Sequence, residues 1–186
     1  MRAKLAAILC VMILLSGCGK ESDALGKAVA LRNKLLSGNG CRFQATVTAD
    51  YGEKIYIFSL DCETDKNGDL SFRVSAPATI AGIAGNVSGT GGSICFDDVV
   101  LAFPTIAGGQ ITPVTAPWLL IKTLRSGYLR DCSLHSDGFS MCIDDSYSDE
   151  AFQLNIDTKD DTPISAEIFW KNRRILTVAI ENFVIL

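Results

Sequence analysis

The residues of this 186-residue chain that could carry chemistry are one histidine, seven cysteines and three pairs of adjacent aspartates. A thiol beside a base is an activated nucleophile, so His135 could serve Cys95 or Cys132. Nothing in the sequence brings these side chains together, and we expect His135 to be solvated at a hairpin tip. The aspartate pairs lack the alternating oxygen ligands of a calcium loop. We expect solvated strand ends at Asp97-Asp98, Asp144-Asp145 and Asp160-Asp161.

Other catalytic motifs are missing from the sequence. It contains no G-x-S-x-G, H-E-x-x-H or S-x-x-K pattern. The glycine cluster Gly89-Thr90-Gly91-Gly92 is not followed by the Lys-Ser/Thr pair of a phosphate-binding loop, and is read as a turn. We therefore expect no enzyme, no cofactor and no metal site.

The first eighteen residues have the form of an export signal. Arg2 and Lys4 precede an apolar run, residues 5–15, which is too short to cross a bilayer. Leu15-Ser16-Gly17-Cys18 resembles the lipobox of bacterial lipoproteins at all four positions. The resemblance implies that residues 1–17 are removed as a signal peptide and that Cys18 becomes a diacylated N-terminus. The alternative is an ordinary signal peptide with a chance cysteine.

An acylated Cys18 would place the chain outside the cytoplasm, anchored to a cell membrane. Two acyl chains hold a protein on a membrane where one chain does not. Residues 18–23 would form a lipidated tether, with a reach of at most ~17 Å beyond the cysteine, and residues 24–186 a single domain. Removing Arg2 and Lys4 leaves 15 basic against 21 acidic residues, a net charge of −6. This balance argues against a nucleic-acid partner.

Five cysteines follow Cys18, and an extracytoplasmic location permits disulfides. A two-residue turn at Tyr51-Gly52 would place Cys41 opposite Cys62, within bonding range. A three-residue loop, residues 136–138, would place Cys132 opposite Cys142. We therefore predict these two disulfides, with Cys95 left over; the alternative is five reduced thiols.

The hydrophobic periodicity predicts a mainly β, α+β fold. A helix is expected from about Asp23 to Leu36 and a second, apolar helix over residues 115–126. Alternating apolar residues between short turns predict about ten antiparallel strands. The arrangement expected from these elements is a strongly curved sheet covered by the two helices.

Apolar side chains stripe the predicted strands and the second helix. They could form a filled core or line a pocket for an acyl chain or another apolar ligand, and composition does not separate the two. The candidate cavity residues are Phe43, Tyr56, Phe58, Phe72, Trp118, Leu119, Leu124 and Trp170.

The order of these elements resembles the LolA/LolB-type lipoprotein carrier superfamily. The resemblance rests on the lipobox, the leading amphipathic helix, the meandering strands, the inserted apolar helix and the closing segment TPISAEIFWKNRRILTVAIENF. It extends to LolA-like lipoproteins of clostridial sporulation and germination, the GerS type. It implies an open, curved antiparallel β-barrel with the helices as a lid, and acyl chains held on the concave face. The five later cysteines depart from the family pattern.

Two functions remain open from the sequence. The first is a membrane-anchored lipoprotein that binds a lipid or another apolar ligand in the concave face of a half-barrel. The second is an envelope protein-interaction module, for example a partner of a cell-wall or germination enzyme. A solid interior beneath residues 115–126 would favour the second.

Overall fold

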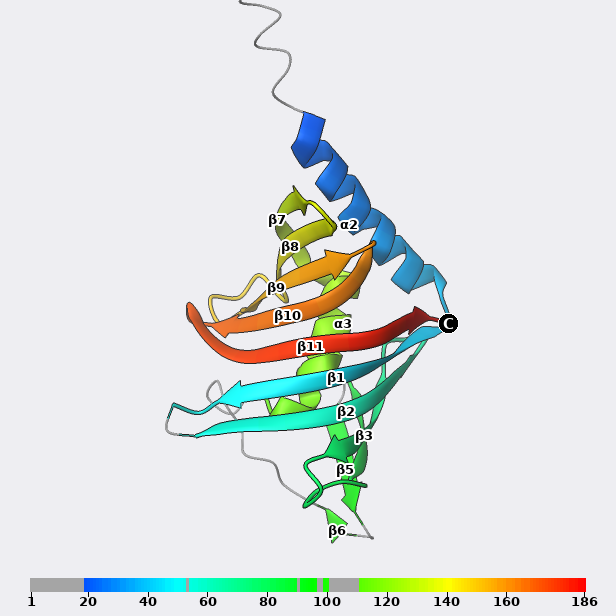
Figure 1. Ribbon diagram of the computed structural model, residues 1–186, viewed down its shortest axis with the longest axis vertical. Coiled ribbons are helices and arrows are strands. Elements are labelled where there is room, and N and C mark those ends of the chain that lie inside the picture. Colours follow the sequence, from blue (N-terminus) through cyan, green and yellow to red (C-terminus); the bar gives the residue numbers. More distant parts are fainter. Residues whose placement is uncertain (1–18, 53, 90, 97–98, 101–110) are drawn as a thin grey trace, which may run out of the picture.

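One curved antiparallel sheet forms most of the molecule (Figure 1). The computed structural model describes residues 19–186, except residues 53, 90, 97–98 and 101–110. The sheet order is β6-β5-β4-β3-β2-β1-β11-β10-β9-β8-β7, so the sheet is open, with β6 and β7 at its edges. The strands are β1 (Gly40–Asp50), β2 (Ile55–Asp65), β3 (Leu70–Ala76), β4 (Ala84–Ser88), β5 (Gly91–Phe96), β6 (Val99–Val100), β7 (Tyr128–His135), β8 (Gly138–Asp144), β9 (Phe152–Lys159), β10 (Thr162–Trp170) and β11 (Arg173–Ile185).

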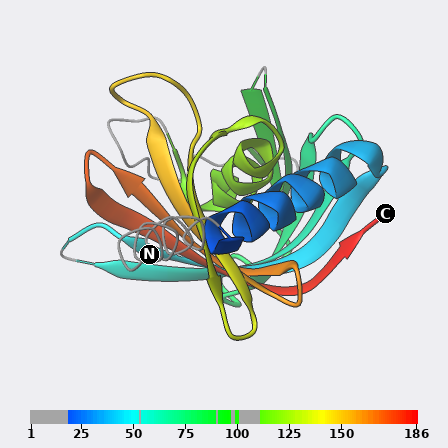
Figure 2. The same cartoon turned by 90° about the horizontal axis from the view of Figure 1, so that it is seen from above.

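Two α-helices lie against one face of this sheet, which we call the inner face (Figure 2). They are α2 (Gly19–Ser37) and α3 (Ala116–Ser126), the latter preceded by the 3-10 turn η1 (Pro113–Thr115). Pro117 is tolerated in the first turn of α3, where no amide partner is needed. The predicted fold class, an open curved antiparallel sheet with a leading and an inserted helix, is confirmed.

The leading helix begins earlier than predicted. α2 starts at Gly19, so the part of the expected tether after Cys18 is helical. A helix rises about 1.5 Å per residue, less than half the rise of an extended chain. The residues after Cys18 therefore continue the helix of the folded domain and reach less far than an extended tether would. Among the described residues, no helix is long and apolar enough to cross a membrane. Cys18 itself lies outside the described residues.

The strands alternate buried and exposed residues, as a sheet with one covered face requires. In β1 the side chains of Phe43, Ala45 and Val47 are buried on the inner face, and Arg42 and Gln44 are exposed on the outer face. The same alternation continues through β2 from Phe58 onward and through β3, β8, β9 and β10. The inner-face side chains and both helices belong to one continuous hydrophobic core.

The first hairpin has a longer turn than the sequence suggested. Asp50 pairs with Ile55, so the turn spans residues 51–54, and the predicted two-residue turn is wrong. The carboxylate of Asp50 accepts a hydrogen bond from the Gly52 amide (2.7 Å), and the Tyr51 amide donates to the Lys54 carbonyl (3.0 Å). An Asp side chain that binds the backbone two residues on stabilises such a turn.

The longer turn changes the cysteine register. Cys41 lies opposite Thr64, and Cys62 lies opposite Phe43. A shift of two residues leaves both thiols on the inner face but no longer opposite each other. Both cysteines are free thiols, so the structure contradicts the predicted Cys41–Cys62 disulfide.

The β7–β8 hairpin has a shorter turn than predicted. His135 pairs with Gly138, so the loop has two residues, and Gly138 has no positive φ. A register change of one residue moves a side chain to the other face. Cys132 is buried on the inner face and Cys142 is half-buried on the outer face. Both are free thiols, so the predicted Cys132–Cys142 disulfide is also contradicted.

Candidate binding surfaces

The predicted cavity residues on the strands face the inner side of the sheet, and the other three lie on α3, which covers that side. Phe43, Phe58 and Phe72 are buried on the first three strands, and Leu119 and Leu124 are buried on α3. Tyr56 is 40% exposed, and Trp118 and Trp170 are half-buried against the core. The structure therefore brings these residues together on one face, but five of them are core residues.

The inner face beneath α3 is filled by side chains. Leu120 and Ile121 are fully buried, as are Val114 before the helix and Leu154 and Ile168 on the sheet below. Five hollows lined by described residues lie on the outer face and around the edges of the sheet, and no α3 residue lines any of these five. In the part of the chain that the structure describes, the side chains beneath α3 therefore belong to a packed core.

Arg32 of α2 binds the end of α3. Its Nε donates to the Leu124 carbonyl (2.8 Å), and its Nη2 donates to the Gly127 carbonyl (2.9 Å). Carbonyls in the last turn of a helix have no partner within the helix. Burial lowers the pKa of the Arg32 guanidinium, but arginine keeps its charge in proteins.

Arg125 of α3 makes the reciprocal connection. Its Nη1 donates to the carbonyl of Leu35 near the end of α2 (2.8 Å), and its Nη2 donates to the carbonyl of Lys66 in the β2–β3 turn (2.7 Å). We call Arg32 and Arg125 the arginine latch. Because each arginine binds carbonyls outside its own helix, the two helices and a sheet turn are held together as one layer.

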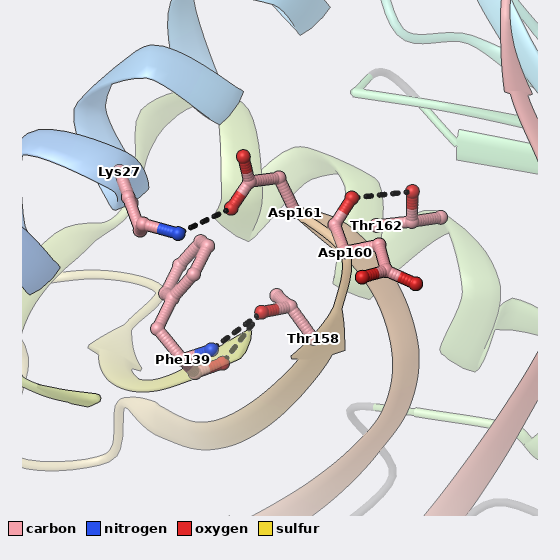
Figure 3. A network of polar contacts seen from close by, with 6 residues as sticks. All are labelled: Lys27, Phe139, Thr158, Asp160, Asp161 and Thr162. Carbon is pink, nitrogen blue, oxygen red and sulfur yellow. Dashed lines mark hydrogen bonds and ion pairs between the residues drawn. The ribbon is translucent and has the colours of Figure 1, made fainter. Parts of the chain in front are cut away.

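A second set of polar contacts lies beside the middle of α2 (Figure 3). Lys27 forms an ion pair with Asp161 in the β9–β10 turn (3.1 Å). Beside it, the fully buried Thr158 hydroxyl donates to the Phe139 carbonyl (2.7 Å) and accepts from the Phe139 amide (3.0 Å). The Lys27–Asp161 pair ties the middle of α2 to the β9–β10 turn, and the Thr158–Phe139 bonds join β9 to β8 beside it.

The outer face carries a trough of about 640 Å³ across β1 to β5. Arg42 pairs with Glu63 (2.9 Å), and the Gln44 amide donates to Asp61 (3.0 Å). These groups largely satisfy one another across the strands, as pairs on an exposed sheet face do. The trough is therefore explained as a solvated outer face.

The thiols show no sign of activation. Burial raises the pKa of Cys41, Cys62 and Cys132, and of the half-buried Cys142. A reactive cysteine requires a lowered pKa. His135 is exposed at the tip of β7, and the side chain of Cys95 lies outside the described residues. Among the described residues, no group of three or more His, Cys, Asp or Glu could hold a metal.

An aromatic rim remains at the hairpin-tip end of the inner face. It consists of Tyr51, Tyr56 and Phe58, with Tyr51 edge-on to Tyr56 (5.4 Å between centroids) and Tyr56 stacked on Phe58 (6.3 Å). At the same level of the sheet, the buried Nε1 of Trp170 has no hydrogen-bond partner, and the Lys171 ammonium lies 4.3 Å from its ring centre. The rim is apolar surface that the helices leave uncovered.

Comparison with known proteins yields similar structures only. No protein-family model matches the chain, and a search of curated proteins finds no match. A LolA superfamily protein from Nitrosomonas europaea is 9% identical, with 91% of this chain and 94% of that chain covered and a TM-score of 0.45. The lipoprotein LppX of Mycobacterium tuberculosis is 12% identical (88% and 96% covered, TM-score 0.46). An outer membrane lipoprotein-sorting protein domain from Vibrio parahaemolyticus is 5% identical (89% and 93% covered, TM-score 0.47). At these values, function has to be argued from this chain's own residues.

The sequence interpretation missed the arginine latch. The apolar spacing of Ala28, Leu31 and Leu35 puts Arg32 on the polar side of the leading helix, and a helical wheel does not show a neighbouring helix end. A signal was present, since Arg125 lies in the last turn of α3 and Gly127 follows it. Basic side chains near a helix end are candidates to bind free carbonyls.

Proposed function

We propose that this chain is a membrane-anchored, extracytoplasmic lipoprotein that acts by binding another envelope protein, and not by catalysis. The anchor would be Cys18, supported by the four lipobox positions and by the helix that begins at Gly19. Among the described residues, no activated thiol and no metal-binding cluster supports a role in catalysis.

The observation that favours a protein partner is the filled inner face. A ligand site for an acyl chain needs a preformed apolar cavity or a lid that moves. The side chains beneath α3 are fully buried, and the arginine latch ties both helices to the sheet. A rigid scaffold of this kind presents its outer surfaces and loops to partners.

A second candidate function is the binding of an apolar or lipid ligand at the aromatic rim. It is supported by Tyr51 and Tyr56, which leave apolar surface at the open end of the inner face, and by the unpartnered Nε1 of Trp170 nearby. Such a ligand would lie across the rim and not beneath α3.

The test is native mass spectrometry of the full-length protein released from membranes. We expect the acylated chain, with no further lipid at one-to-one stoichiometry, and a second protein that remains bound after dilution. A stoichiometric lipid that is lost on Tyr56→Ser, but kept on the matched exposed change Tyr147→Ser, would instead establish the rim as the ligand site.

A further inference from the structure

The start of β2 has a free strand edge in the described structure. β3 pairs with β2 only as far as Ala76, opposite Ser59, and then the chain turns back towards β4. The β1–β2 hairpin therefore projects past its neighbour (Figure 1). In an antiparallel pair, successive residues direct their backbone groups alternately to the two neighbouring strands. Since Tyr51 closes the turn on Lys54, Ile55 and Ile57 direct their amides and carbonyls towards this open side.

This edge is apolar on both faces. Ile55 and Ile57 are 66% and 58% exposed on the outer face, and Tyr56 is 40% exposed on the inner face. Three consecutive exposed apolar residues at an unpaired edge are a template for another strand.

The β7 edge of the sheet is built differently. β7 carries a bulge between Leu129 and Asp131, with Arg130 at the bulge, and Arg130 forms an ion pair with Asp144 (3.4 Å). Bulges and charges are the devices by which proteins block edge pairing. The start of β2 has neither a bulge nor a charge between residues 55 and 57.

We propose that a second copy of this chain pairs with this edge. The occupant has to supply an extended segment that is apolar on both faces and uncharged, and residues 55–57 of another copy meet that requirement themselves. Antiparallel pairing with Tyr56 on the two-fold axis places Ile55 opposite the other copy's Ile57. Both residues direct backbone groups to the edge, so the two such pairs exchange four hydrogen bonds. The pairing also covers both exposed apolar edges at once.

The contact is small. Three side chains and one short strand bury less than the ~1,200–2,000 Å² of a standard interface. The dimer is therefore weak and depends on concentration. It requires no movement of α2 or α3 and does not rest on the proposed partner or on the anchor.

The test is photo-crosslinking of the full-length chain in the membranes of cells that produce it. A benzophenone amino acid replaces Ile57 and, as a matched control, replaces Ile164, which is 42% exposed on β10. The expected product from position 57 has twice the chain mass, and its joined peptides both derive from the β1–β2 hairpin. Ile55→Lys in the same chain buries a charge against the other copy, and should lower this product at least about tenfold, or ~1.4 kcal/mol.

Ile164→Lys in the position-57 background serves as the control substitution and should leave the crosslink unchanged. Thermal unfolding of both lysine variants shows whether either loses the fold. A position-57 probe that yields no dimer, that crosslinks only to a different protein, or that gives a dimer insensitive to Ile55→Lys in a folded variant would overturn the proposal.

Discussion

Residues 118–121 (Trp-Leu-Leu-Ile) and residues 55–58 (Ile-Tyr-Ile-Phe) are equally apolar, yet the structure uses them differently. In α3, Leu119, Leu120 and Ile121 are buried between the helix and the sheet. At the start of β2, Ile55 and Ile57 project into solvent. Coverage by a neighbouring element, and not hydrophobicity, therefore separates core from contact surface. The predictions below test whether the covered region is a closed core and the uncovered one a surface.

The largest expected difference is between two truncations. Leu120→Ala should lower the free energy of unfolding by about 2–5 kcal/mol, because it leaves a cavity in a packed core. Ile57→Ala removes an exposed side chain and should change it by less than about 0.5 kcal/mol. Denaturant unfolding of both variants measures the contrast. Equal losses of stability in the two variants would contradict the distinction between a covered core and an exposed surface.

The second-largest loss of stability is expected when the arginine latch is broken. Arg32→Ala leaves the carbonyls of Leu124 and Gly127 without their charged donor and should cost about 1.5–3 kcal/mol. The matched control is Arg42→Ala, which breaks an exposed pair with Glu63 and should cost at most about 1 kcal/mol. If Arg32→Ala were no more harmful than Arg42→Ala, the helices would not depend on the latch.

An enlarged side chain tests directly whether the interior is full. Ala45 is buried at the centre of the inner face, so Ala45→Leu should overpack the core and destabilise it by about 1–3 kcal/mol. Ala81→Leu, at an exposed turn, provides the same change without burial. An open cavity over β1 would instead accept the leucine and leave the unfolding midpoint unchanged or raised.

The smallest expected effect concerns Asp65, which lies beside the β2–β3 turn. In that turn the Lys66 carbonyl accepts a hydrogen bond from Arg125. Slight burial raises the pKa of the Asp65 carboxyl, but hydrogen bonds from the amides of Asp69, Asn67 and Gly68 outweigh it and lower the pKa. A lowered folded-state pKa gives stability that is complete above the unfolded value of about 3.9 and is lost as the pH falls through the folded value. Unfolding measured from about pH 5 down to pH 2 should show a smaller acid loss in Asp65→Asn than in wild type. An identical pH slope in both proteins would contradict this.

Periodicity predicted most of the fold. The change from helical to alternating spacing after Leu36 located α2 and the strands, and α3 was predicted to within one residue of its observed bounds. These elements are set by local residue order, which a single sequence contains.

Turn lengths and contacts between distant elements were not predictable in the same way. The Asp50 carboxylate extends the first hairpin turn by two residues, and Gly138 is needed because Thr158 lies against it and not for a positive φ. The longer first turn and the shorter β7–β8 turn shift the strand register, and the register decides which residues lie opposite the cysteines. The arginine latch joins residues about 90 positions apart in the chain, so no local pattern contains it.

Hydrogen exchange of the α3 amides tests the central claim most directly, that α3 is part of a closed core and not a moving lid. Amides of a closed core exchange only when the whole domain unfolds, whereas a lid opens at a lower free energy. We predict that the amides of Leu120, Ile121 and Leu124 exchange with the same opening free energy as those of Val47 in β1 and Val178 in β11. Exchange of the α3 amides through a separate, lower-energy opening, while the amides of Val47 and Val178 stay protected, would contradict this claim. It would show that α3 is a moving lid.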